Sequence, residues 1–210
     1  MSNDNSPADS RLFSPSTARN REPIHGVLSG LLGESARLLE FASGSGEHAV
    51  YMAERHPDWQ WQPSDINEAA IQSIEAWRTH SGLSNILPAQ HRNLLADDDA
   101  LQHSAEHWNA MLAINLIHIS PWQVTERLMG VAGQQLVSGG LLFLYGPYRR
   151  NGKHTAPSNA EFDAWLKARD PSWGVRDLEQ VIAEAAGNNL SLHGVEQLPA
   201  NNLAVTFQRA

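Results

Sequence analysis

The sequence predicts an α/β protein in which helices cover both faces of a mostly parallel, seven-stranded sheet whose last strand is antiparallel. Short apolar runs alternate with longer amphipathic segments along the chain, a pattern typical of this three-layer architecture. A glycine-containing turn follows the first apolar run, between Arg37 and Ala49. The two last apolar runs are separated by only a few residues, which indicates a hairpin at the carboxyl end.

Length and composition indicate one domain. The chain has 210 residues, and we expect a disordered lead at residues 1 to 13 and a single domain at residues 14 to 210. Neither a signal peptide nor an apolar run long enough to span a membrane is expected. The absence of cysteine excludes disulfides and thiolate metal sites, and it is compatible with the cytoplasmic location that we expect. A formal charge of −8 argues against a generic nucleic-acid-binding surface, so we expect a small-molecule partner.

The elements follow from hydrophobic periodicity. Strands are predicted near residues 36–41, 59–64, 85–90, 108–114, 140–145, 191–197 and 202–209. Helices are predicted near residues 47–55, 67–81, 94–103, 121–136, 159–167 and 177–187. A further amphipathic segment near Ile24 to Leu32 precedes the first strand and is expected to cover the pocket, with Asn20 and Arg21 as polar groups beside it.

The turn after the first strand is typical of a nucleotide site. Gly44 and Gly46 allow the backbone to approach a ligand closely, and the helix that begins near Glu47 directs free N–H groups towards it. The letters from Gly44 to Ala49 also match the dinucleotide pattern G-x-G-x-x-G/A. The turn by itself therefore does not distinguish NAD from S-adenosylmethionine (SAM).

Two carboxylates and the final hairpin favour SAM. Glu40 lies directly before the turn, where its charge would repel a pyrophosphate but attract the α-amino group and the sulfonium of SAM. Asp65, about twenty residues after the glycines, has the spacing of a carboxylate that binds ribose hydroxyls, a feature of both cofactors. The connection Leu198 to Asn201 is too short for a helical crossover, so the last strand is antiparallel. This is the class I methyltransferase topology, whereas an NAD domain would end on a parallel strand.

The residues that follow each strand are the next candidates, because ligands of open α/β sheets bind at the carboxyl ends of the strands. Asn93, followed by Leu94, could read an adenine edge or simply cap a helix, and Asn115 lies where the methyl group would be presented. His118 could act as a general base or pack in the core. Tyr145 and Tyr148 flank a Gly-Pro turn and could line an acceptor pocket or close the core.

Two clusters carry weaker signals. Residues 103–107 match the H-x-x-E-H zinc pattern, but they precede a strand, at the edge away from the pocket, and no clear third ligand follows, so no metal is expected. Arg149, Arg150, Lys153 and His154 lie in a predicted loop that could be solvated or could bind an anion.

Several motifs in order give the chain a resemblance to a family of class I SAM-dependent methyltransferase-like proteins of bacteria and animals, classified as a domain of unknown function. The motifs are Ser14 to Ile24, Glu40 to His48, Pro63 to Asp65, Asn115 to Trp122, Tyr145 to Tyr148, Ser158 to Asp163, Arg169 to Glu179 and Pro199 to Leu203. The resemblance implies a SAM pocket formed by Glu40, Gly44, Gly46, Asp65, Asn93 and Asn115, with Asn20 and His48 close by. It implies no particular substrate. The chain departs from the common glycine pattern at Ala42.

We therefore expect a SAM-dependent methyltransferase that transfers the methyl group directly, in line, to a small molecule and releases S-adenosylhomocysteine. If the acceptor must lose a proton, the candidate bases are His118, Tyr145 and His154. The expected substrate pocket comprises Arg21, His118, Tyr145, Tyr148, Asn201 and Asn202. The alternatives are an NAD-linked oxidoreductase and a SAM-binding protein without catalytic activity.

Overall fold

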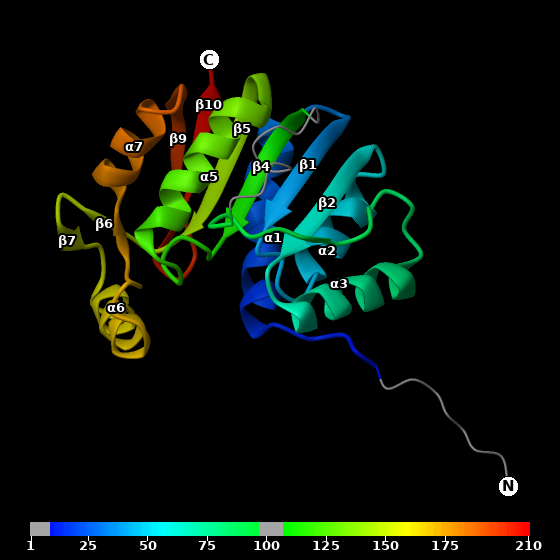
Figure 1. Cartoon of the computed structure of the whole chain (residues 1–210), viewed down its shortest axis with the longest axis horizontal. Coiled ribbons are helices and arrows are strands. Elements are labelled where there is room, and N and C mark those ends of the chain that lie inside the picture. Colours follow the sequence, from blue (N-terminus) through cyan, green and yellow to red (C-terminus); the bar gives the residue numbers. More distant parts are fainter. Residues whose placement is uncertain (1–8, 97–106) are drawn as a thin grey trace, which may run out of the picture.

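The computed structural model describes residues 9–96 and 107–210 and has three layers (Figure 1). The central strands are β1 (Ala36–Phe41), β2 (Trp59–Asp65), β3 (Gln90–His91), β4 (Trp108–Ile114), β5 (Leu136–Gly146), β9 (Leu190–Leu198) and β10 (Asn202–Arg209). Their order is β3-β2-β1-β4-β5-β10-β9. β1 pairs in parallel with β2 and β4, and β10 pairs antiparallel with both β5 and β9. The expected mostly parallel sheet with an antiparallel last strand is confirmed.

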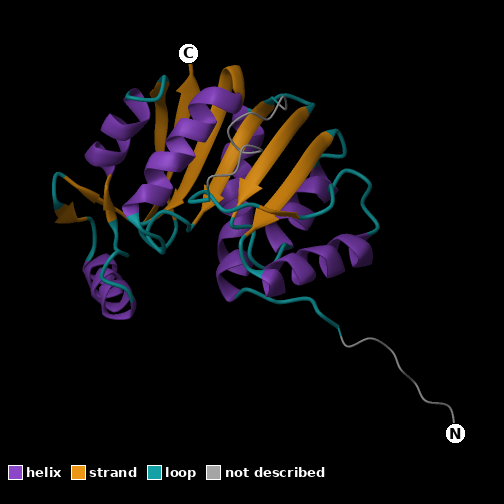
Figure 2. Ribbon diagram, in the orientation of Figure 1, coloured by secondary structure: helices purple, strands orange, loops and turns teal. Residues whose placement is uncertain are grey.

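Helices cover both faces of this sheet (Figure 2). α1 (Pro15–Leu31), α2 (Glu47–Arg55) and α3 (Glu68–Ser81) lie on one face, whereas α5 (Trp122–Gln135) and α7 (Leu178–Ala186) lie on the other. α6 (Pro157–Arg169) lies below the carboxyl ends of the parallel strands, next to a small sheet of β6 (Tyr148–Arg150), β7 (Lys153–His154) and β8 (Arg176–Asp177).

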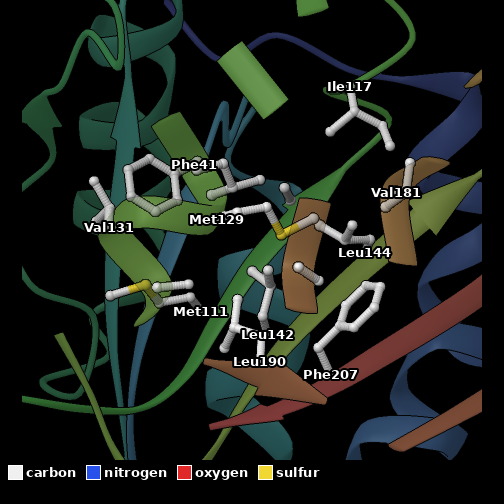
Figure 3. Packing of buried hydrophobic residues seen from close by; sticks show 14 of the residues in the cluster. Phe41, Met111, Ile117, Met129, Val131, Leu142, Leu144, Val181, Leu190 and Phe207 are labelled. Atoms are coloured by element: carbon white, nitrogen blue, oxygen red, sulfur yellow. The ribbon is translucent and has the colours of Figure 1, made fainter. Parts of the chain in front are cut away.

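Two apolar cores result from the alternation of side chains along the strands. Leu39 and Phe41 of β1 point into the core under α5 and α7, together with Met111, Leu142 and Phe207 (Figure 3). Leu38 points the other way and packs with Ile24 and Leu28 of α1, Met52 of α2, and Trp61 of β2. Residues 38 to 41 of β1 are thus buried from both sides.

The structure corrects two element boundaries. α1 begins at Pro15, with the Ser14 side chain as its N-cap, and it continues through Pro23, whereas the sequence predicted an amphipathic segment only from Ile24. Proline is favoured in a first helical turn and disfavoured inside a helix, so Pro23 conceals the helix from a pattern search. β3 contains only Gln90 and His91, and Ile86 forms an isolated bridge with Trp61 before it. Pro88 lies between the two and cannot donate to a ladder. The helix predicted at residues 94–103 falls mostly outside the described residues.

The predicted loop after β5 is a hairpin instead. Arg149 pairs with His154, and Arg150 pairs with Lys153, across a turn at Asn151 and Gly152. Both turn residues have positive φ, which suits the Asn-Gly sequence. Arg150 forms an ion pair with Glu179 at 3.0 Å, so the basic cluster is partly neutralised.

Part of the predicted lead contacts the domain. The Leu12 N–H donates to Ser73 Oγ at 2.8 Å, and Trp77 Nε1–H donates to the Leu12 carbonyl at 2.9 Å. The Phe13 ring meets the edge of Trp77 with centroids 5.2 Å apart. Among the described helices, none is long and apolar enough to cross a membrane.

The contact between α5 and the chain after α7 generates a test of the fold. A Cβ added at Gly133 would collide with the Asn188 carbonyl, whereas one at Gly130 would meet only Asn188 Oδ1 at 3.7 Å. Gly133→Ala should therefore lower the free energy of unfolding by about 1–3 kcal/mol. Gly130→Ala, in the same helix, should leave stability equal or raise it by up to about 1 kcal/mol. Urea unfolding measures both, and equal effects would show that this close contact is absent.

Candidate functional site

The turn after β1 has a backbone that only small residues tolerate. Ala42, Gly44 and Gly46 all have positive φ, at 53°, 58° and 89°. A Cβ at Gly46 would also lie 2.9 Å from the Ile74 Cα of α3, so glycine is required there on two grounds. Gly46 is the N-cap of α2 and offers no side chain to its first N–H groups. The Glu47 N–H donates to Ser45 Oγ at 3.5 Å, and the amides that follow it in the first turn can donate to an electron-rich ligand group.

Asp65 joins the ends of β1 and β2. Its Oδ2 accepts the Gly44 N–H at 2.9 Å, and its Oδ1 accepts the Asn67 N–H at 2.9 Å. Each carboxylate oxygen has a second lone pair, so Asp65 keeps the capacity to accept ribose hydroxyls. The carboxylate therefore braces the turn.

Glu40 lies beneath the turn rather than at the open surface. It is 1% exposed, and its Oε2 accepts the Trp61 Nε1–H at 3.0 Å. Burial raises the pKa of Glu40 to about 7, against the opposing hydrogen bonds of Trp61 and Ser43, and the Asp65 charge adds to the rise. A cation bound nearby would favour the ionised form, but contact between Glu40 and a ligand amine stays a prediction.

A buried polar cluster connects the turn with the end of the sheet. His48 Nε2 and Asn20 Oδ1 are 2.9 Å apart, and both side chains are buried. Burial, with a smaller contribution from the Arg21 charge, lowers the pKa of His48 to about 4, so the ring is neutral and donates to Asn20. Burial also raises the pKa of Tyr145, and hydrogen bonds with Asn20 and Asn202 oppose this rise. The cluster thus connects α1, α2, β5 and β10.

The loop after β4 carries Asn115 and His118. Asn115 has φ 57°, and its N–H donates to the Tyr145 carbonyl at 2.8 Å. His118 is 2% exposed, and burial, aided by the Arg176 charge, lowers its pKa to about 3. A Cβ at Gly146 would meet His118 Cε1 at 2.6 Å, so this close packing needs glycine.

Arg176 holds that loop in place. Its guanidinium donates to the Ile117 carbonyl at 2.9 Å and to the Ser120 carbonyl at 2.5 Å. The Gly174 N–H donates to the His118 carbonyl at 3.0 Å. The position of His118 therefore depends on the segment between α6 and α7.

A cavity of about 630 Å³ lies at this edge of the sheet. It is bounded by α1, the loops after β4 and β5, α6, and the turn between β9 and β10. Six predicted site residues line it, namely Asn20, Asn115, His118, Tyr145, Asn201 and Asn202. Other lining residues were not among the predicted site residues, and they include Arg19, Asn159, Phe162 and Trp165. The Ser158 to Asp163 motif includes Asn159 and Phe162, although no chemistry was assigned to that motif.

Three residues predicted for the pocket or for catalysis do not line the cavity. Tyr148 is buried in the core under α5 and α7, because the chain leaves β5 at Gly146 and Tyr148 begins β6 of the small sheet. The Arg21 guanidinium stacks over the Tyr51 ring, 4.8 Å from its centroid. His154 Nε2 lies 3.3 Å from Asp163 Oδ2, in the small sheet. These three residues therefore lie away from the cavity, and their roles at the acceptor stay predictions.

The residues after β3 show a structural role. Asn93 Oδ1 accepts the Leu95 N–H at 2.9 Å, a local side-chain contact with the backbone, and contact of Asn93 with an adenine edge stays a prediction. Leu94 is buried in the core. Ile66 and Leu95, in contrast, are 62% and 48% exposed, directly after β2 and just beyond β3. Because Asp65 and His91 are paired, these two apolar side chains follow neighbouring strands at one edge. The sequence signal for this apolar surface was Ile66, an apolar residue directly after Asp65 at the end of β2.

The metal prediction can be compared only in part. No group of three potential ligands occurs in residues 9–96 and 107–210. Most of the H-x-x-E-H segment lies outside these described ranges.

The burial of Glu40 makes stability depend on pH. The folded protein holds this proton more tightly than the unfolded chain, so the stabilisation is complete below about pH 4.5 and is lost as pH rises through about 7. Glu40→Gln should remove this dependence. The free energy of unfolding of the ligand-free variant minus that of wild type should therefore be about 3 kcal/mol larger at pH 8 than at pH 5. His48 and His118 titrate with the opposite sign, so the comparison uses the difference between variant and wild type.

The measurement is chemical unfolding at several pH values. Glu54→Gln is the matched control, because Glu54 is exposed and forms its ion pair with Arg55 at the surface. A constant difference between Glu40→Gln and wild type across this range would contradict the assignment.

Comparison with solved structures identifies the fold as that of class I methyltransferases. An O-methyltransferase family protein from Burkholderia thailandensis superposes with a TM-score of 0.77 at 16% identity, over 93% of this chain and 57% of that chain. An O-methyltransferase family 2 protein from Planctomyces limnophilus, solved in complex with apigenin, gives 0.71 at 17% identity, over 90% and 62%. CalO1, a methyltransferase of calicheamicin biosynthesis solved in its SAH-bound form, gives 0.70 at 12% identity, over 90% and 54%. The chain thus spans little more than half the length of these enzymes.

Sequence comparison gives a short match and a long one. A stretch of 48 residues, 23% of this chain, is 35% identical to a tRNA (guanine-N(7)-)-methyltransferase from Synechococcus sp. (strain JA-3-3Ab), of which it covers 20%. The long match extends over residues 11–209, almost the whole chain, and it is to a family model. The chain therefore belongs to the family described as "Protein of unknown function (DUF938)".

Proposed function

We propose that this protein is a SAM-dependent methyltransferase that acts on a small molecule. The observation that carries the proposal is the position of the cavity: Asn115 lines it, and β4, which Asn115 follows, pairs with β1, whose glycine turn is the predicted cofactor site. Cofactor and acceptor would then meet at the carboxyl ends of these central strands. The class I methyltransferase fold supports this interpretation.

The residues present fit SAM. Gly44 and Gly46 have the positive φ that favours glycine, a Cβ at Gly46 would collide with Ile74, and Asp65 retains lone pairs for a ribose. Ile66 and Leu95 offer exposed apolar surface that an adenine ring could cover. Glu40 and the neutral pair of Asn20 and His48 would face the amino-acid end of the cofactor. When bound, SAM supplies a methyl group already activated by its sulfonium.

The protein's own chemistry would be mainly positioning. His118 is held neutral by burial, with a lowered pKa, which makes it a weak base. Tyr145 has a raised pKa and stays a hydrogen-bond donor. These two are the candidate bases that line the cavity, and they suit alignment of the acceptor nucleophile more than strong proton abstraction.

The small-molecule acceptor is supported by size and by charge. A volume of about 630 Å³ lies within the range of roughly 300–1,000 Å³ typical of small-ligand pockets. The net charge of −8 offers little for a polyanion such as tRNA. A cytoplasmic location remains part of this proposal.

The cofactor assignment is tested by titration calorimetry with SAM, S-adenosylhomocysteine and NAD. Wild type should bind the first two and not NAD; NAD binding without SAM binding would favour the oxidoreductase alternative. Asp65→Ala should weaken SAM binding by about 1–3 kcal/mol through lost ribose hydrogen bonds.

Because Asp65 also braces Gly44, the effect on stability needs its own control. Asp65→Asn keeps an oxygen for one of the two backbone N–H groups but loses the negative charge. Urea unfolding of both variants separates loss of the fold from loss of the ribose contact. Unchanged SAM affinity in a folded Asp65→Ala variant would remove this residue from the site.

Catalysis is tested separately from binding. Radiolabelled methyl transfer from SAM into metabolite and protein fractions of a lysate should label a small molecule. Tight SAM binding without any labelled product would favour a binding protein that lacks activity.

A further inference from the structure

The cavity indicates the class of acceptor, an inference that rests on the proposed function. We propose that the acceptor is a planar aromatic molecule that carries an anionic group, with Arg19 pairing the anion and Phe162 and Trp165 contacting the ring. The charge of the lining, its aromatic wall and the use of its amide groups each support this assignment.

The charge of the lining is one-sided. Among the described residues that line the cavity there is no aspartate, glutamate or lysine, and Arg19 supplies the one permanent charge. Arg19 is exposed on α1, and its guanidinium makes no hydrogen bond or ion pair with any part of the chain that the structure describes. Its charge acts on Tyr145, which also lines the cavity. In a chain of net charge −8, an unpartnered guanidinium at an acid-free cavity favours an anionic ligand and disfavours an amine.

An aromatic wall forms the side contributed by α6. The Phe162 and Trp165 rings stack with centroids 5.7 Å apart and planes inclined by 24°. The Phe162 ring also meets His118 at 5.7 Å, so it is fixed from the opposite side. Trp165 is nevertheless 49% exposed, although the Arg169 guanidinium lies over its ring at 3.3 Å from the centroid, and Ile119 of the facing loop is exposed as well. Large apolar groups left open in a cavity are typical of a surface that a flat apolar ligand covers.

Most amide groups of the lining already have partners within the protein. Asn159 donates to Thr155 Oγ1 and to the Asn201 carbonyl, each at 3.0 Å. Asn201 Nδ2 donates to Ser158 Oγ at 3.2 Å, and Asn202 Nδ2 to the Pro199 carbonyl at 3.2 Å. A sugar or another molecule with many hydroxyl groups would find few free N–H donors among these amides, whereas a ring with one anionic group needs only the guanidinium and the apolar wall.

The test measures binding to the full-length chain by calorimetry. S-adenosylhomocysteine is titrated first, and the acceptor probes are then titrated with and without it. The probes are 4-hydroxybenzoate and 6-hydroxy-2-naphthoate as aromatic anions, 4-hydroxybenzamide as the neutral counterpart, 4-hydroxybenzylamine as the cation, and cyclohexanecarboxylate as the non-aromatic anion. The aromatic carboxylates should bind about tenfold more tightly than the amide and than cyclohexanecarboxylate, and the amine should bind most weakly.

Variants assign the selectivity to residues. Arg19→Gln should abolish the difference between 4-hydroxybenzoate and 4-hydroxybenzamide, and Arg19→Lys should restore part of it. Arg55→Gln makes the same charge change on α2, where the guanidinium stacks over Tyr51, and should keep the difference. Trp165→Leu should reduce binding of the aromatic carboxylates but not that of cyclohexanecarboxylate.

Several outcomes would overturn the proposal. They are equal binding of the carboxylate and the amide by wild type, preference for the amine, or no binding of either aromatic carboxylate at millimolar concentration. Failure of S-adenosylhomocysteine to bind would instead count against the proposed function, because the ligand selectivity of the cavity is measured without it as well.

Discussion

The carboxyl ends of β1 and β2 are held together by polar contacts, and the arrangement of the site depends on this junction. Asp65 accepts the Gly44 N–H, the Ser43 N–H donates to the Ser64 carbonyl at 2.9 Å, and Ser64 Oγ donates to the Glu40 carbonyl at 2.7 Å. These bonds satisfy backbone groups that a left-handed turn removes from the sheet ladder. Without them the turn would have no fixed shape. With them, the N-terminus of α2 and the ends of two neighbouring strands keep one geometry.

A second polar connection relates that junction to the cavity. Asn20 contacts His48 on one side and Tyr145 on the other, so α1 touches both the helix after the glycine turn and the strand that borders the cavity. Both groups are neutral, because burial lowers the pKa of His48 and raises that of Tyr145. A buried network of neutral groups avoids the cost of an unpaired charge and fixes one packing of α1 against the sheet.

The sequence predicts the sheet and the glycine turn well, because these features depend on local chemistry. Apolar runs, the spacing of Gly44, Gly46 and Asp65, and the short connection before Asn202 each have a direct physical meaning. The sequence did not reveal the start of α1, because proline is favoured in the first turn of a helix and disfavoured inside one, so Pro23 was compatible with a helix that begins near it. The hairpin of Asn151 and Gly152 was missed because its flanking strands are too short to show alternation.

The cavity was harder to predict, since its walls come from segments far apart in the chain. Phe162 and Trp165 have the spacing of any apolar helix face, and nothing local indicates that α6 turns them towards His118. Tyr145 and Tyr148 look equivalent in the sequence, yet Tyr145 belongs to β5 of the central sheet and Tyr148 begins β6 of the small sheet, and they are buried in different cores. Glu40 lies where it was expected, but its contact with the Trp61 indole depends on the neighbouring strand.

The order of the elements along the chain sets the order in which the two parts of the predicted site are made. Every residue predicted to hold the cofactor precedes residue 116, whereas the turn between β9 and β10, with Asn201 and Asn202, closes the cavity from the far end of the chain. During translation the nucleotide half is therefore present long before the opposite wall of the cavity has left the ribosome. A nascent chain carries the predicted cofactor contacts first and gains the acceptor chamber only when its final hairpin is added to the sheet.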